Sequence, residues 1–328
     1  MNDPGAAAIE VRGLTKQFGD SLAVDRAEFD VIEGEVFGYL GPNGAGKTTT
    51  INMLTGLARP TAGTIRYFGR DVTQNVKKVQ HLMGVVPDES NLYPELTGQE
   101  NLCFCASLYG MRKSEREHQA RELIAQFGLA DAAGKRFAVY SKGMKRKLAI
   151  AAAIIHRPPI LFLDEPTTGI DVSSARQVRQ MLTDLKSQGT TIFLTTHYIE
   201  EAERLCDRIA FILDGKLVKL DTPGNLVRGI QNQHVVELTI SGSGTDLTGP
   251  LHETFSEGRF ERISATILRM HSDLPVQLAP LIRFLEERGV GVLEARVIRP
   301  SLEDVFVTIT GVELEQMRKE KEKGGRGS

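Results

Sequence analysis

The stretch Gly41-Pro-Asn-Gly-Ala-Gly-Lys-Thr48 fits the pattern G-x-x-x-x-G-K-[ST]. It follows an apolar, strand-like run at residues 35–40, and it opens a segment with a helical pattern at residues 48–57. In such a loop the glycines let backbone N–H groups surround phosphate oxygens, and the start of the helix adds a positive dipole. We expect Lys47 to reach the β- and γ-phosphates and Thr48 to offer its hydroxyl to Mg²⁺. The stretch therefore predicts a nucleoside triphosphate site formed by Gly41, Pro42, Asn43, Gly44, Ala45, Gly46, Lys47, Thr48 and Thr49.

A second part of the same site is predicted further along the chain. The apolar run at residues 160–163 has the length and character of a buried parallel strand, and it ends in Asp164 and Glu165. Ligands of open α/β sheets bind beyond the carboxyl ends of the strands, so Asp164 is expected near the phosphates as an Mg²⁺ ligand. Neighbouring strand side chains face opposite ways, which leaves Glu165 free to act as general base for an attacking water.

Three further motifs give the chain a family resemblance. Tyr140-Ser-Lys-Gly-Met144 resembles an LSGGQ signature, Thr167-Thr-Gly-Ile-Asp171 resembles a D-loop, and Thr195-Thr-His197 resembles a switch histidine. Together with the two segments above, and in this order, they resemble the nucleotide-binding subunits of ABC transporters from about residue 9 to residue 221. The resemblance implies an α/β fold, a P-loop NTPase (RecA-like) core with an antiparallel β subdomain and a helical subdomain.

The resemblance also implies roles for residues outside the phosphate loop. Phe18 would stack on adenine, and His197 would donate to the γ-phosphate. The signature of one subunit, with Ser141 and Gly143, would close over the ATP held by another subunit, and Asp171 of the D-loop is counted with these nucleotide-binding residues. Each motif occurs once and the chain has no internal repeat, so two nucleotide-binding subunits are expected per working unit.

The signature can also be interpreted from its residues alone. Ser141 is a good helix N-cap, and Gly143 permits the close approach of a phosphate. The alternative is that Ser141 only caps a helix, and that the basic side chains near it form a solvated face. These side chains are Lys142, Lys145, Arg146 and Lys147.

Three positions depart from the pattern of the resembled family. Asp88 stands where most members have a glutamine that touches Mg²⁺ and the attacking water. We count Asp88 among the catalytic and metal-binding residues, and its negative charge should make the site depend more strongly on Mg²⁺. Lys142 replaces the first signature glycine, and Met144 replaces the final glutamine. The acidic residue and this signature are similar to the subgroup of daunorubicin-type exporters.

Local patterns divide the chain into domains. An ATP-binding domain is expected at residues 9–229, with an antiparallel layer from the strand-like residues 9–14, 23–29 and 64–67. A helical subdomain is expected at about residues 88–155, where Thr97-x-x-Glu100 and Ser114-x-x-Glu117 fit capping boxes. The dipeptide Asp214-Gly215 predicts a β-hairpin.

A smaller C-terminal domain is expected after the core. Residues 234–311 are interpreted as a compact accessory α+β domain with a strand at 263–270, a helix at 275–288 and a strand at 291–298. Its last helix should be capped by Ser301, and residues 313–328 should form a disordered tail. The segment 299–306 resembles the ending of ABC-2 type export ATPases, which favours export.

The amino-acid composition limits the kinds of partner that we expect for this chain. The chain is 41% hydrophobic and 25% charged with a net charge of −2, so there is no electrostatic case for nucleic acid. The longest apolar stretch, at residues 148–155, is shorter than the roughly 20 residues that cross a bilayer, and the first residues lack the pattern of a signal peptide. Three cysteines do not suggest a disulfide framework, and Cys103 and Cys105 lie two apart on a predicted helix, where they do not face each other.

The predicted function follows from the motifs and the resemblance. We expect an ATPase that uses ATP and Mg²⁺, works with a second copy of itself or a homologous subunit, and drives a separate permease from the cytoplasmic face of the membrane. The permease contact is expected at residues 87–94, with Leu92 and Tyr93 exposed, unless these two pack inward. The alternatives are an importer, a soluble ABC ATPase that does not transport, and an ATP-gated scaffold with little turnover.

Overall fold

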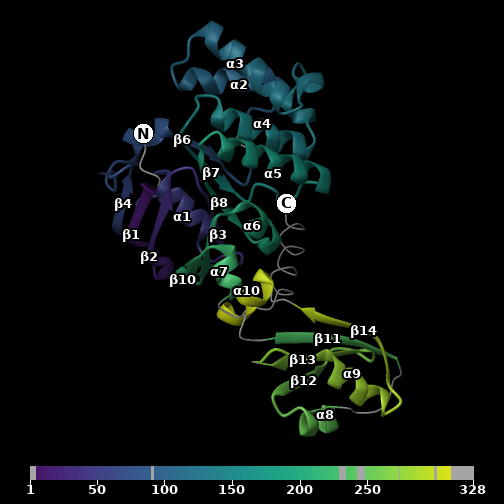
Figure 1. The fold of residues 1–328 in the computed structure, drawn as a ribbon. Helices are drawn as coiled ribbons and strands as arrows, with labels where there is room; N and C mark the ends of the chain where they lie inside the picture. Colours follow the sequence, from purple (N-terminus) through teal and green to yellow (C-terminus); the bar gives the residue numbers. More distant parts are fainter. Residues whose placement is uncertain are drawn as a thin grey trace. The chain divides into compact units, whose positions relative to one another are not determined.

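The computed structural model describes residues 5–89, 92–228, 234–241, 248–272, 274–298 and 301–311 (Figure 1). These residues form two compact units, one up to Thr222 and one at Pro223–Gly311. The predicted tail at 313–328 lies outside the described residues, as do positions 299 and 300 of the segment that favoured export. Within the described part of the chain, none of the helices is both long enough and apolar enough to cross a bilayer.

A six-stranded sheet forms the centre of the first unit. Its inner strands are parallel and consist of continuous apolar runs, as expected for a sheet that is covered on both faces. Only the edge strand β10 is antiparallel. It joins β9 through Asp214 and Gly215, which both have positive φ, so the predicted hairpin is confirmed. The strand order is β10 (Lys216–Asp221), β9 (Arg208–Leu213), β3 (Val36–Leu40), β8 (Thr191–Thr196), β7 (Ile160–Asp164) and β6 (Met83–Val86).

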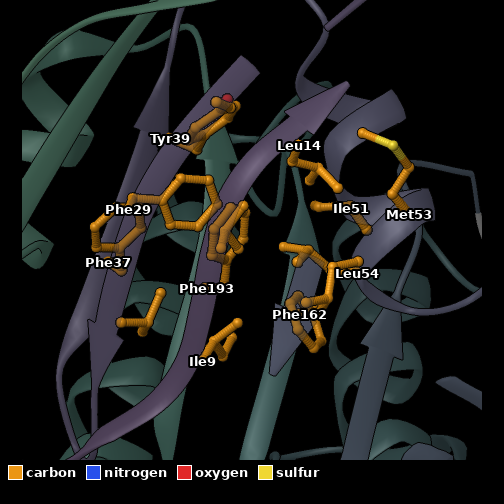
Figure 2. Close-up of a cluster of buried hydrophobic side chains, with 14 of the residues drawn as sticks. Ile9, Leu14, Phe29, Phe37, Tyr39, Ile51, Met53, Leu54, Phe162 and Phe193 are labelled. Atoms are coloured by element: carbon orange, nitrogen blue, oxygen red, sulfur yellow. The ribbon is translucent and has the colours of Figure 1, made fainter. Parts of the chain in front are cut away.

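An antiparallel sheet covers one face of the central sheet and confirms the predicted layer. Aromatic side chains from both sheets fill the space between them (Figure 2). Phe37 of β3 stacks on Phe29 of β2, with ring centroids 5.4 Å apart, and on Phe193 of β8, at 5.5 Å. Because this apolar layer is closely packed, it holds the central strands in place and so fixes the positions of the residues at their ends. The strand order is β2 (Ser21–Ile32), β1 (Ala7–Phe18), β4 (Ala62–Tyr67) and β5 (Arg70–Asp71).

The helices of the first unit pack on the sheets or on one another. In Figure 1, α4 lies between the pair α2 and α3 and the helix α5. Three 3₁₀ segments occur at Val76–Leu82, Ala130–Ala132 and Phe137–Val139. The helices are α1 (Lys47–Leu54), α2 (Gly98–Leu108), α3 (Lys113–Gln126), α4 (Lys142–Ile154), α5 (Val172–Ser187) and α6 (Ile199–Leu205).

Two local predictions in the helical region were wrong. The capping box of Thr97 and Glu100 is present, but Ser114 does not cap α3. The helix begins at Lys113, two residues before the start that a Ser114 cap predicts. Arg112 takes the extended backbone of the cap, so Ser114 already lies in the first turn. Leu92 is buried rather than exposed, whereas Tyr93 is half exposed and lies edge-on against Phe104. The burial of a loop side chain depends on its tertiary contacts, which the local sequence of the loop does not specify.

The second unit is an α+β domain. Its antiparallel sheet has the order β12, β13, β11, β14, and apolar side chains of α8 and α9 join its core. The strand predicted at residues 263–270 is present as β13 but begins later than expected, and its hairpin partner β12 was not predicted. The capping of the last helix by Ser301 is confirmed. The elements are α7 (Pro223–Arg228), β11 (His234–Ser241), α8 (Thr248–Thr254), β12 (Gly258–Arg262), β13 (Ile267–Ser272), α9 (Leu278–Glu286), β14 (Gly291–Ile298) and α10 (Leu302–Thr310).

Candidate nucleotide site

A pocket of about 670 Å³ opens at the carboxyl ends of the central strands. This volume lies within the range of roughly 300–1,000 Å³ that is usual for small-molecule sites. The phosphate loop, the end of β7 and the end of β8 contribute to its wall, as the strand–loop–helix pattern predicted. The lining residues are Ala23, Asn43, Gly44, Gly46, Lys47, Thr48, Thr49, Asp88, Asp164, Glu165, Thr168, Gly169 and His197.

Two glycines fix the path of the phosphate loop. A Cβ at Gly41 would collide with the carbonyl oxygen of Ile212 on β9, and a Cβ at Gly46 would collide with that of Ala23 on β2. Gly46 also has a φ of 101° and is the N-cap of α1. A side chain is therefore excluded at both ends of the loop, and α1 starts with its free N–H groups at the pocket.

Lys47 is held at the floor of the pocket. Its ammonium donates to the carbonyl oxygens of Gly41, at 2.8 Å, and Pro42, at 3.1 Å, and lies 3.3 Å from Oε1 of Glu165. The side chain is nearly buried. The cation is thus preorganised in the loop, and a bound phosphate would have to compete with Glu165 for it.

Thr48 and Asp164 meet across the pocket from distant parts of the chain. The Thr48 hydroxyl donates to Oδ2 of Asp164 at 2.7 Å, and the Thr195 hydroxyl donates to Oδ1 of the same carboxylate. Asp88 lines the same pocket. A hydroxyl and one or two carboxylates, completed by substrate phosphates, are the hard oxygen donors that Mg²⁺ takes. Among the described residues no cluster of three or more His, Cys, Asp or Glu could hold a metal ion.

Glu165 lies at the turn directly after β7. Its φ is 48°, an uncommon conformation for a non-glycine residue, and its N–H donates to the carbonyl and hydroxyl oxygens of Thr195 at 3.2 and 3.1 Å. Its Oε2 accepts from the hydroxyl of Thr168 at 2.9 Å and lies 2.8 Å from Nδ1 of His197. Burial raises the pKa of Glu165, but His197, Lys47 and Thr168 outweigh burial and lower the pKa to about 2. The group is a carboxylate at neutral pH, as a general base must be.

His197 brings an unsatisfied nitrogen to the pocket. The side chain is nearly buried, and Nε2 has no hydrogen-bond partner among the described residues. A buried polar nitrogen without a partner is costly, and a phosphate oxygen would satisfy it. This geometry fits the predicted contact between His197 and the γ-phosphate.

Comparisons with known proteins decide the family. Residues 24–168 match the family described as ABC transporter. The chain is 39% identical to the daunorubicin/doxorubicin resistance ATP-binding protein DrrA of Streptomyces peucetius over 324 residues. This alignment covers 95% of this chain and 94% of that protein. The chain belongs to the ABC transporter family. It is also 33% identical over 313 residues to the linearmycin resistance ATP-binding protein LnrL of Bacillus subtilis, over 92% of this chain and 98% of that protein.

Solved structures of the family agree with the fold. The structure of an ATP-binding subunit of an ABC transporter aligns with a TM-score of 0.62 and 30% identity, over 68% of this chain and 93% of that chain. The dimeric, post-hydrolysis structure of the cassette MJ0796 bound to ADP and Pi aligns with a TM-score of 0.61 and 27% identity, over 65% and 98%. This ABC transporter subunit is thus an ATP-binding cassette with ATPase activity.

Several predicted nucleotide contacts of this ABC subunit do not line its pocket. Ser141 caps α4 by accepting from the N–H of Met144 at 3.2 Å, and Asp171 caps α5 in the same way through Ser174. Gly143 presents its face to Ser174, where a Cβ would collide with the Ser174 hydroxyl. Phe18 is 55% exposed at the end of β1. The contacts of these four residues with nucleotide stay a prediction.

Two features of the ABC subunit were missed or misjudged from the sequence. Arg146 and Lys147 are buried, so they are not part of a solvated face. Glu201 of α6 is also buried and accepts from the hydroxyls of Thr167, at 2.7 Å, and Thr196, at 2.9 Å. It joins the D-loop to the end of β8, which His197 follows directly. In the sequence Glu201 is one of three glutamates in the short helix α6, and nothing local distinguishes it from the other two.

Proposed function

We propose that the chain is the ATP-hydrolysing subunit of a membrane exporter. The observation that carries this proposal is the identity of 39% with DrrA along nearly the whole of both chains, which includes the second unit as well as the cassette. Other similar proteins are named for the export of Nod factors and of fluoroquinolones, at 37% and 38% identity. The daunorubicin-type resemblance of the signature supports the same class.

Two copies would work together. The pocket of one chain holds the phosphate loop, Glu165 and His197, whereas Ser141 and Gly143 lie outside its lining. A second copy can supply this missing wall, and a related cassette has been solved as a dimer. ATP between the two copies would favour the closed pair, and loss of the γ-phosphate would remove this bridge.

Several residues have a proposed task in nucleotide binding or hydrolysis. Lys47 would neutralise the β- and γ-phosphates, and His197 would donate Nε2–H to the γ-phosphate. Thr48, Asp164 and Asp88 would hold Mg²⁺, which offsets the charge of the transferring phosphoryl group. Glu165 would accept the proton of the attacking water. Phe18 would stack on adenine.

A hollow of about 630 Å³ is our proposed contact for the permease. It lies where the helical region meets the central sheet, and Leu57 and Leu108, at 70% and 69% exposure, are the most exposed of its apolar side chains. An apolar face of a short permease helix would bury them. This contact would hold the subunit at the cytoplasmic face of the membrane. The lining residues are Thr55, Leu57, Gln80, His81, Met83, Val85, Pro87, Leu108 and Tyr109.

Replacing Glu165 by Gln tests the catalytic and two-copy parts of the proposal. The variant should bind ATP, lose phosphate release by about 10²-fold or more, and sediment as a dimer at saturating MgATP. The exposed Glu200→Gln is the matched control and should behave as the unchanged protein. Normal hydrolysis by Glu165→Gln would show that Glu165 is not the base. A single protomer at saturating MgATP, even with the permease present, would disprove the two-copy arrangement.

The export assignment has its own test. A membrane protein encoded beside this chain and purified with it should raise its ATPase rate and move an apolar drug into inverted membrane vesicles when ATP is supplied outside them. An ATP-gated scaffold, the rival function, would bind MgATP with negligible turnover under the same conditions. Steady-state phosphate release therefore separates the two functions.

A further inference from the structure

The helix α4, which we call the signature helix because it begins in the signature, places a buried cation at the rim of the pocket. The side chain of Arg146 on α4 is only 8% exposed. Its Nη1 donates to the carbonyl oxygen of Pro87 at 2.7 Å, and its Nη2 donates to that of Asp88 at 2.6 Å. Nη2 also lies 3.4 Å from Oδ1 of Asp88. The planar guanidinium thus grips two successive backbone carbonyls, a geometry that an ammonium cannot match.

A second contact makes this connection rigid. Further along α4, the carbonyl oxygen of Ala153 lies so close to Gly84 of β6 that no Cβ fits between them. The strand β6 and the segment that follows it are therefore held to α4 at two points, near its start and near its end. A displacement at Asp88 cannot be absorbed by sliding of the strand along the helix.

Charge explains why a cation is needed at this point. Asp88, Asp164 and Glu165 are three carboxylates that line one pocket. Lys47 lies next to Glu165, and Arg146 is the cation next to Asp88. Without Arg146 the Asp88 carboxylate would be repelled by the other two.

We propose that Arg146 is a positioning residue that joins Asp88 at the pocket rim to the signature helix, so that the two move as one body when nucleotide binds. The inference deepens the proposed function, since it assigns the link between the occupied pocket and the signature of the same chain. A shift of Asp88 towards bound nucleotide pulls the start of α4, which carries Ser141 and Gly143, towards the position that meets a second copy.

Hydrogen exchange tests the link directly. The intact chain is compared with and without Mg²⁺ and a non-hydrolysable ATP analogue, at a concentration where sedimentation shows a single protomer. Exchange should slow in both segments 83–89 and 142–150. In Arg146→Met the response at 83–89 should remain, and that at 142–150 should fall at least about threefold. The control Arg121→Met removes an exposed guanidinium from α3 and should respond as the unchanged protein.

A second variant and a kinetic readout complete the test. Arg146→Lys keeps the charge and the packing of the stem, so it gives a folded protein if Arg146→Met does not, and its response at 142–150 should also be reduced. Arg146→Met should lower kcat about tenfold while KM for ATP stays within about threefold, a split that a general loss of folding would not give. Full responses at 142–150 in a folded Arg146 variant, or no response there in the unchanged protein, would overturn the proposal. Both of these exchange results are obtained without hydrolysis and with a single protomer, so they are independent of whether the proposed function is correct.

Discussion

Nζ of Lys47 lies 3.3 Å from Oε1 of Glu165, so the cation of the phosphate loop is paired with the carboxylate that we propose as general base. Both side chains are nearly buried. Because phosphate oxygens would take over Lys47, nucleotide binding would remove one of the groups that lower the pKa of Glu165. The carboxylate would then become a stronger base at the moment its substrate arrives.

Replacement of Lys47 by Ala should reduce ATP turnover by about 10²-fold or more, by analogy with the loss of one preorganised donor at a charged transition state. Steady-state phosphate release measures the effect, and a fluorescent ATP analogue measures binding. Lys219→Ala on the exposed strand β10 is the control. If Lys47→Ala and Lys219→Ala turned over ATP at the same rate, Lys47 would have no role in the reaction.

Replacement of Asp88 by Asn should change the Mg²⁺ requirement more than the affinity for ATP. The Asp88 side chain is 55% exposed at the pocket, and loss of its charge leaves less for Mg²⁺ to neutralise. Two quantities are measured for the variant and for the unchanged protein, the Mg²⁺ concentration for half-maximal turnover and the Kd of ATP. The exposed Asp131→Asn serves as control. An unchanged Mg²⁺ titration would refute the prediction.

Replacement of Gly143 by Ala should destabilise the packing of α4 against α5, because the new methyl group would collide with Ser174. Overpacking of this kind costs about 1–3 kcal/mol of unfolding free energy, which urea titration can measure. Gly134→Ala is the matched control, since a Cβ there meets open space and its φ is not positive. Ser174→Gly in the Gly143→Ala background should restore part of the loss, and no restoration would contradict the proposed clash.

His156 should make folding stability depend on pH. Its ring stacks on Tyr109 with centroids 3.5 Å apart, its Nε2 lies 3.1 Å from the carbonyl oxygen of Met83, and burial lowers its pKa from 6.5 to about 4. Below pH 6.5 the unfolded chain binds a proton that the folded protein refuses, so stability falls as the pH decreases from 6.5 towards 4.

Urea unfolding at pH 7 and pH 5 measures this contribution. Between these values the unchanged protein should lose at most about 2 kcal/mol more than His156→Phe, which keeps a stacked ring but cannot titrate. Equal losses in the two proteins would show that His156 is already protonated in the folded state, or that folding does not lower its pKa.

The local patterns determined the phosphate loop and the acidic pair. Gly41 to Thr48 between a strand and a helix, and Asp164 and Glu165 after a buried apolar run, could be placed from sequence because each pattern is contiguous and its geometry is set by neighbouring residues. Capping at Thr97 and the hairpin at Asp214 were predictable for the same reason.

Tertiary structure alone decided how these parts are connected. The pairing of Lys47 with Glu165, the burial of Arg146 against Pro87 and the support that Glu201 gives to the end of β8 join residues that are far apart in the chain or on different elements. A basic run after the signature has the same composition whether its side chains face solvent or the core. Only the packing of α4 between its neighbours removes water from Arg146, and a desolvated cation must then find the carbonyl and carboxylate oxygens that the fold brings to it.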